Sequence, residues 1–343
     1  MRFPGTKQAI TLLLVGLLCF SLLAGCAPAA DGEADENGEE KMMLRQTTGG
    51  ATGGFYIMAS GVADYLNGNA QSFSVTPITS AGGGVDNLRR MYRKEAELGF
   101  ALAKDVSNAW EGVEPFTEGE IRNVQIIGPA RITMGALVTT LESTGINDFM
   151  TDLKGKRVCP GGVGASETVL FEEFLKLTGL LDDVKITHMN IEEMLDALKN
   201  GEIDVCVRGG PTATPWQGIV ELELTHKAKL LDLGPAMDSI DYFKTNPLAM
   251  DLTIAAGTYD RQDEDIRTYG EPGYYIARDD IPEDVIYEFC KLLFTEEAAQ
   301  LLDDMWPGHE LRATILPPLC VPLHPGAERF WKEQGVEIPT PLR

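Results

Sequence analysis

Two patterns of apolar residues alternate along most of the chain. Short apolar runs of strand length lie at residues 42–46, 73–78, 98–102, 157–159, 184–188, 203–207 and 275–277. Helical spacing of apolar residues covers 55–66, 85–95, 166–178, 282–294, 296–305 and a segment after Asn190. Strands that alternate with helices favour mostly parallel sheets. Because the β-α-β-α-β order occurs twice, at 42–102 and at 157–207, we expect two α/β lobes.

The N-terminus has a different pattern. Arg2 and Lys7 precede an apolar run over residues 9–24, which is shorter than the roughly 20 residues of a membrane-spanning helix. A basic start before a short apolar core predicts a secretory signal peptide at 1–25. The run ends in Leu-Ala-Gly before Cys26, which resembles the lipobox of bacterial lipoproteins. We therefore expect Cys26 to be lipidated and the protein to be extracytoplasmic and membrane-anchored.

Charge separates the next segment from the folded body. Residues 26–41 hold six acidic side chains and almost no apolar one, so they form a predicted solvated tether. The whole chain of 343 residues has 29 basic and 52 acidic side chains, a formal charge of −23. Without the three basic and six acidic residues of the first 41, the body keeps 26 against 46, or −20. Such a field repels phosphate backbones, so nucleic acid is not an expected partner.

Cysteines and histidines offer little chemistry. The body has four cysteines, and no CxxC or Cys/His cluster occurs, so neither a metal nor a cofactor is expected. Cys159 and Cys206 each end a predicted strand and could be neighbours, as buried thiols or as an oxidised pair in an exported protein. No GxSxG motif occurs and the four histidines stand singly, so we do not expect an enzyme.

Three glycine-rich loops are the candidate binding elements. They cover residues 47–56, 79–84 and 160–168, and each lies between a predicted strand and a predicted helix. Ligands of open α/β sheets bind at this edge, where glycine admits a ligand to the backbone and a helix N-terminus favours an anion. None of the loops has a Walker lysine or a GxGxxG pattern, which argues against a nucleotide.

With these loops, the chain resembles the TAXI family of solute receptors, which serve tripartite ATP-independent periplasmic (TRAP) transporters. Thr48–Tyr56 is similar to the TGGTGGxYY opening of that family, and Ser80–Arg89 to its TGGSVENLR segment. Further similar segments are 153–168 (LKGKRVxxGxxGSGT), 204–211 (a strand ending in GGxP), 256–259 (AGTY) and 324–330 (HPGAxRYY). Six segments in the same order make the resemblance specific.

The resemblance implies a two-lobed fold of the periplasmic-binding-protein type, type II-like, with a ligand cleft between lobes of mostly parallel sheet and flanking helices. Lobe 1 is expected over 42–130 and 258–343, and lobe 2 over 131–257. The expected function is capture of a small organic anion or acidic amino acid by lobe closure, and its delivery to a TRAP-type permease. We expect a monomer. The candidate ligand-binding residues are Thr52, Gly53, Gly54, Tyr56, Gly82, Gly83, Ser166, Glu167, Thr168 and Gly210.

Two cations depart from the family pattern. Lys104 follows Ala103 where the family usually has glutamine before the Asp105 position, and Arg208 precedes a Gly-Gly where the family residue is commonly uncharged. Both follow a predicted strand, so they could clamp a carboxylate in the cleft or pair with surface acids. Glu167 would repel an anion unless it binds an ammonium group. Dicarboxylates, 2-oxo acids and glutamate-like amino acids therefore all stay open.

Two other functions fit the same scaffold. An exported enzyme would need a titratable pair or a cofactor lysine in the cleft, for which Lys104 is the visible candidate. A lipoprotein sensor would bind the ligand in the same way and signal its presence. A permease gene beside this one would favour transport, and a sensor-kinase gene would favour signalling.

Overall fold

The computed structural model describes residues 41–51, 53–131, 134–306 and 308–342. The predicted signal peptide, Cys26 and Thr52 lie outside the described residues, as does nearly all of the tether. Residues 42–343 form one compact unit. Within the described residues, no helix has both the length and the apolar character to cross a bilayer.

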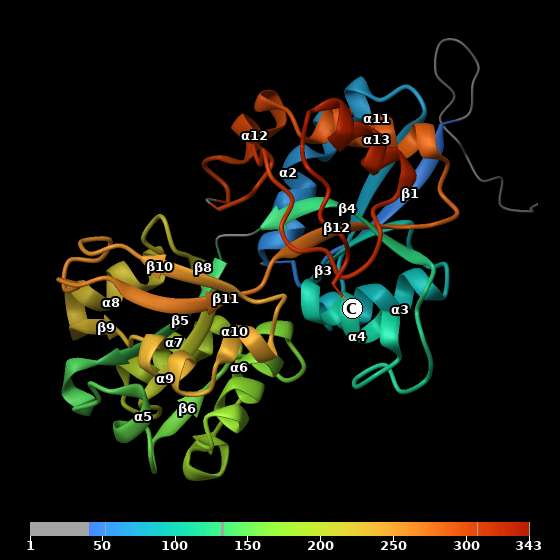
Figure 1. Ribbon diagram of the computed structural model, residues 1–343. Coiled ribbons are helices and arrows are strands. Elements are labelled where there is room, and N and C mark those ends of the chain that lie inside the picture. The colour runs from blue at the N-terminus through green and yellow to red at the C-terminus, as the bar shows by residue number, and fades with distance from the viewer. Residues whose placement is uncertain (1–40, 52, 132–133, 307, 343) are drawn as a thin grey trace, which may run out of the picture. The chain divides into compact units, whose positions relative to one another are not determined.

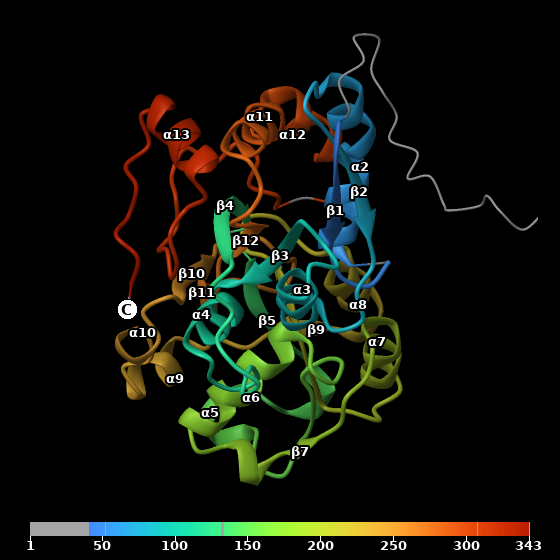
Figure 2. The ribbon, with the colours of Figure 1, turned by 90° about the vertical axis from the view of Figure 1, so that its right-hand side faces the viewer.

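The first sheet has five strands in the order β2-β1-β3-β12-β4. Its strands are β1 (Met42–Thr47), β2 (Phe73–Ile78), β3 (Leu98–Leu102), β4 (Val124–Arg131) and β12 (Gly273–Arg278). Its helices are α2 (Gly54–Asn69), α3 (Gly83–Tyr92), α4 (Ala103–Glu111), α11 (Glu283–Leu293), α12 (Glu296–Leu302) and α13 (Pro325–Glu333). Helices α2 and α11–α13 lie over one face of the sheet, and α3 and α4 lie over the other (Figures 1 and 2). We call this part, residues 42–131 and 273–342, lobe 1.

The second sheet has the order β10-β11-β5-β8-β6-β7, and β9 also pairs with β5. Its strands are β5 (Met134–Leu141), β6 (Arg157–Cys159), β7 (Lys185–Ile186), β8 (Val205–Pro211), β9 (Ala228–Leu230), β10 (Met250–Ile254) and β11 (Ile266–Gly270). Its helices are α5 (Phe149–Asp152), α6 (Ser166–Leu177), α7 (Ile191–Lys199), α8 (Gln217–His226), α9 (Gly234–Ser239) and α10 (Tyr242–Thr245), with short 3-10 turns at Glu142–Thr144 and Leu181–Asp183. We call residues 134–270 lobe 2.

The two-lobed α/β fold agrees with the sequence, but the sheets are mixed rather than mostly parallel. Strands β1–β3 and β6–β8 make the expected parallel pairs. Strand β12 enters the first sheet from lobe 2 and runs antiparallel to both β3 and β4. Strand β5 likewise runs antiparallel to β8, β9 and β11. The antiparallel pairs therefore involve the strands next to the two crossings between the lobes.

The second crossing also differs from the expected boundary. Residues 258–270 were assigned to lobe 1, but β11 pairs with β10 over Ile266–Gly270 and contacts β5 at Gly135. The chain therefore returns to lobe 1 at Glu271 and Pro272, not at residue 258. The crossing occurs where the hydrogen-bonded ladder ends, which apolar spacing alone does not reveal.

Candidate functional site

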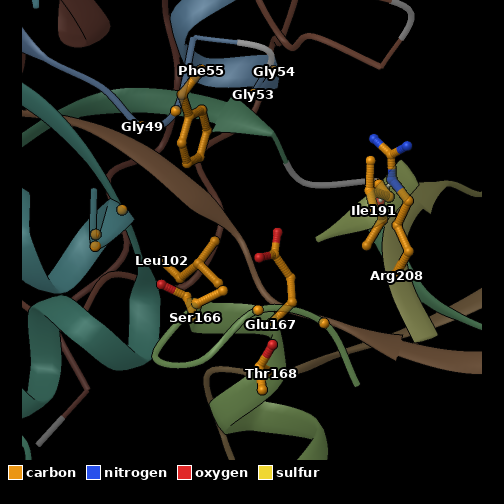
Figure 3. Close-up of a pocket in the computed structure, with 18 of the residues that line it drawn as sticks. Gly49, Gly53, Gly54, Phe55, Leu102, Ser166, Glu167, Thr168, Ile191 and Arg208 are labelled. Atoms are coloured by element: carbon orange, nitrogen blue, oxygen red, sulfur yellow. Dashed lines mark hydrogen bonds between the residues drawn. The ribbon is translucent and has the colours of Figure 1, made fainter. Parts of the chain in front are cut away.

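The three glycine loops line one cavity of about 380 Å³. The loops after β1 and β2 belong to lobe 1, and the loop after β6 belongs to lobe 2. Figure 3 shows the loop of Gly49, Gly53 and Gly54 opposite the first turn of α6. The carboxyl ends of parallel strands meet at one sheet edge, and this edge faces the cavity in both lobes. The cavity is therefore an interlobe cleft.

Three helices begin at this cavity. Gly53, Gly82 and Ala165 precede α2, α3 and α6, and none of them caps its helix with a side-chain hydrogen bond. The first backbone N–H groups of a helix have no acceptor within the helix, and the helix dipole makes this end positive. Three such ends around one cavity form an environment that favours an anion.

A half-buried ion pair joins the two lobes at the cavity. Arg131, the last residue of β4, donates from Nη2 to Glu167 Oε1 at 2.9 Å. The arginine side chain is 8% exposed and the glutamate side chain is 42% exposed. The guanidinium carbon also lies 5.3 Å from the centre of the Phe55 ring. Burial raises the pKa of Glu167, but the charge and hydrogen bond of Arg131 outweigh it, so the pKa is lowered and the carboxylate is ionised.

Arg208 on β8 provides a second guanidinium. Its carbon lies 4.2 Å from the centre of the Trp216 ring, and its Nε donates to the Gly209 carbonyl at 3.0 Å. In the described part of the chain, Arg208 has no carboxylate partner within ion-pair distance. Burial lowers its pKa, against the opposite effect of the Glu167 charge. A half-buried cation held flat against a ring suits a bidentate acceptor such as a carboxylate.

A second acid joins the lobes beside the cavity. Ser166 Oγ, on the first residue of α6, donates to Asp105 Oδ2 at 2.6 Å. Asp105 belongs to α4 of lobe 1, and the carboxylate is so close to Gly84 that a Cβ there would overlap it. Burial raises the pKa of Asp105 to about 6, although the Ser166 hydrogen bond opposes this change. Asp105 therefore occupies a place between the starts of α3 and α6.

Most of the predicted site residues line this cavity. They are Gly53, Gly54, Gly82, Gly83, Ser166, Glu167, Thr168 and Arg208. Thr168 Oγ1 donates to the Pro160 carbonyl at 3.1 Å, within lobe 2. Tyr56, Lys104 and Gly210 are not among the lining residues.

The position of Lys104 contradicts a clamp that points into the cleft. Its Nζ lies 3.3 Å from Glu173 Oε1, so the cation is paired with an acid of α6. Its backbone N–H donates to Glu271 Oε2 at 3.0 Å. The neighbours Ala103 and Asp105 are buried, whereas the Lys104 side chain is half-buried beside Glu173. Gly210, for its part, lies against Leu137 of β5.

Arg131 is a charged cavity residue that sequence reasoning missed. It ends an otherwise apolar strand, just before the chain passes to lobe 2. A charged residue at the carboxyl end of a buried strand, next to a lobe boundary, is the signal that indicates it. Phe55 and Trp306 also line the cavity, although the sequence indicates only a helical core position for Phe55 and no role for Trp306.

Other expectations concern metals and thiols. The described residues contain no group of three or more histidine, cysteine or acidic side chains that could hold a metal ion. Cys159 and Cys206 are register partners on β6 and β8, and both are buried free thiols. They are therefore neighbours, as their positions at strand ends suggested.

Comparison with solved structures defines the class of fold. The chain is similar to a binding-protein component of an ABC phosphonate transporter from Pseudomonas aeruginosa, with a TM-score of 0.51, 9% identity, and 79% of this chain and 81% of that chain covered. For the periplasmic aliphatic sulphonate binding protein SsuA from Escherichia coli, the values are 0.46, 15%, 77% and 79%. Two α/β lobes with a cleft between them are the fold of periplasmic binding proteins. Residues 47–335 match the NMT1-like family, so the chain belongs to this family.

Proposed function

We propose that this protein is an extracytoplasmic solute receptor of a transporter, which captures a small organic anion in the interlobe cleft. The convergence of three uncapped helix N-termini on one cavity supports this function. Arg208 adds a cation without a carboxylate partner in the described part of the chain. Ligand contacts with both lobes stabilise the closed arrangement, because only a difference in affinity between open and closed forms shifts their populations.

The transporter is a TRAP system in this proposal, and the protein is its TAXI-type receptor. The support is the set of six sequence segments similar to that family, three of which contain the cavity loops. The lipobox-like sequence before Cys26 supports anchoring by a lipid, and the acidic residues 26–41 then serve as the tether. A fused TRAP permease encoded next to this gene is the expected genomic neighbour. The genes of an ABC permease and ATPase in that place would contradict this part.

A thermal-shift screen tests the receptor function. The panel contains monocarboxylates, dicarboxylates, 2-oxo acids, acidic amino acids, sulfonates and phosphonates, each with the full chain. Stabilisation without turnover is the expected result, and small-angle scattering should show a smaller radius of gyration with a bound ligand. Absence of binding by every anion, or formation of a product from one, would contradict the proposal.

Substitution of Arg208 tests the anion contact. In Arg208→Ala, calorimetry should show at least about tenfold weaker binding of each ligand that the screen finds, since a charge-assisted hydrogen bond is lost. Arg157→Ala is the matched control, because Arg157 belongs to none of the cavity loops and forms an ion pair with Asp204 at 2.6 Å. Equal affinities of the two variants would exclude Arg208 from the site.

A further inference from the structure

The charges inside the cavity do not balance. Two guanidinium groups, of Arg131 and Arg208, and one carboxylate, of Glu167, belong to residues that line it. The carboxylate is bonded to Arg131, so one of the two cations is already neutralised by the protein. Arg208 is left as the cation that a ligand can neutralise.

Glu167 is held in place by its surroundings. Its partner Arg131 is buried and packs against Phe55, so the guanidinium has little freedom to follow another anion. Gly209 makes room for the glutamate, because a Cβ there would come within 3.1 Å of its Oε1. In Figure 3 the carboxylate points away from the start of α6 and into the cavity. An incoming anion therefore meets a fixed negative charge next to the positive one.

Apolar side chains and the glycines of the three loops make up most of the rest of the cavity wall. Large apolar side chains come from both lobes and include Phe55, Met134, Val163, Ile191, Met194 and Trp306. Ile191 and Met194 belong to α7, and Arg208 belongs to β8, so all three residues are in lobe 2. Apolar surface next to one guanidinium that has no carboxylate partner among the described residues suits a ligand with one charged end and a hydrocarbon body.

We propose that the cleft selects monoanions with an apolar body, such as a monocarboxylate or monosulfonate, and that Glu167 is the residue that excludes dianions. This inference rests on the proposed receptor function and narrows its ligand class. Arg208 holds the anionic group, the apolar wall holds the body, and Glu167 faces any second anionic group. Because Arg131 is the counter-ion of Glu167, the ligand does not need an ammonium group to pair with this glutamate.

Simple electrostatics sets the size of the effect. Two like charges about 5 Å apart at an effective dielectric constant of about 20 change an equilibrium constant by more than about a hundredfold, and the charge of Arg131 beside Glu167 cancels part of this repulsion. Solvent screens part of this repulsion, since Glu167 is 42% exposed. A discrimination of about tenfold against a dianion of equal length is therefore the expected minimum.

Hexanoate and adipate are the probes, because they have the same number of carbons and differ by one carboxylate. Calorimetry with the full chain at pH 7 should show at least about tenfold tighter binding of hexanoate, and hexanesulfonate should bind like hexanoate. Glu167→Gln should reduce the hexanoate-to-adipate ratio at least tenfold, since Arg131 becomes available to a second carboxylate. Glu173→Gln, the same charge change on the same helix at the Lys104 pair, should leave the ratio unchanged.

The outcomes separate this inference from the receptor function. Adipate binding as tightly as hexanoate to the parent protein overturns the inference, as does any dianion that binds more tightly than its monoanionic counterpart in the anion screen. Both results leave the receptor function standing, whereas binding of no anion removes both. The hexanoate-to-adipate affinity ratio of the parent protein requires no variant, so it tests the inference even if Glu167→Gln does not fold. An unchanged ratio in a folded Glu167→Gln variant excludes Glu167 as the cause.

Discussion

The hydrogen bond from Ser166 to Asp105 allows a stability prediction with a built-in test of its cause. It is 2.6 Å long, buried, and joins α6 of lobe 2 to α4 of lobe 1. Ser166→Ala removes the donor with almost no change of shape. The Asp105 carboxylate then stays buried without this partner, which should lower the free energy of unfolding by about 2 kcal/mol when the acid is ionised.

The pH dependence follows from the direction of the pKa shift. Burial raises the pKa of Asp105 from an ordinary value of 3.8 to about 6, so ionisation of this acid lowers stability as the pH rises from about 4 through 6. The serine hydroxyl stabilises the ionised form, and its removal raises the pKa further. The variant should therefore lose the full 2 kcal/mol at pH 8 and about half as much at pH 5, where the carboxyl group is protonated.

Calorimetric unfolding at pH 5 and pH 8 measures both losses, with Thr168→Val as the control. Thr168 lies on the same helical turn and is also buried, but its hydroxyl donates to the neutral Pro160 carbonyl. Its loss should be the same at both pH values. A loss for Ser166→Ala that does not grow between pH 5 and pH 8 would refute the assignment of the effect to ionised Asp105.

Three further predictions concern other buried groups. Gly84→Ala should lower the free energy of unfolding by about 1–3 kcal/mol in denaturant titrations, because the new Cβ overlaps the Asp105 carboxylate. Burial raises the pKa of Glu271 from an ordinary value of 4.5 to about 8, so ionisation of this acid lowers stability as the pH rises from about 4.5 to 8. The free energy of unfolding of Glu271→Gln, taken relative to that of the parent, should therefore be higher at pH 9 than at pH 6 by on the order of 1 kcal/mol or more. The same difference at both pH values would contradict this prediction. The thiols of Cys159 and Cys206 should resist iodoacetamide in the native protein and react after unfolding, as mass spectrometry of the labelled peptides can show.

Local features of this fold were predictable, because they depend on neighbouring residues. Helix α7 begins after Asn190, as the apolar spacing indicated, and a capping box in which Asn190 and Glu193 bond to each other's backbone fixes this start. The glycine loops lie at one cleft because parallel strands place their carboxyl ends at a common edge. These inferences needed only short-range patterns and one rule of topology.

The remaining features depend on contacts between distant residues. The place of β12 between β3 and β4 is decided by pairing across more than 140 positions of the chain. Lys104 and Arg208 both follow strands, yet Lys104 points to Glu173 and Arg208 stacks on Trp216. Nothing in the local sequence distinguishes these two cations. Arg131 became a site residue only when the crossing brought the end of β4 to the start of α6.

The net charge of the protein acts in the same direction as Glu167. A body with a formal charge of −20 repels every anion at long range, and the repulsion grows with the charge of the ligand. At physiological ionic strength this field is screened over about 8 Å, so inside the cleft the helix N-termini and Arg208 dominate. A monoanion meets the weaker long-range repulsion and finds Arg208, which has no carboxylate partner among the residues that the structure describes. A dianion meets twice the long-range repulsion, and in the cleft its second anionic group meets the negative charge of Glu167. The long-range field and the short-range field therefore both select a ligand with one negative charge.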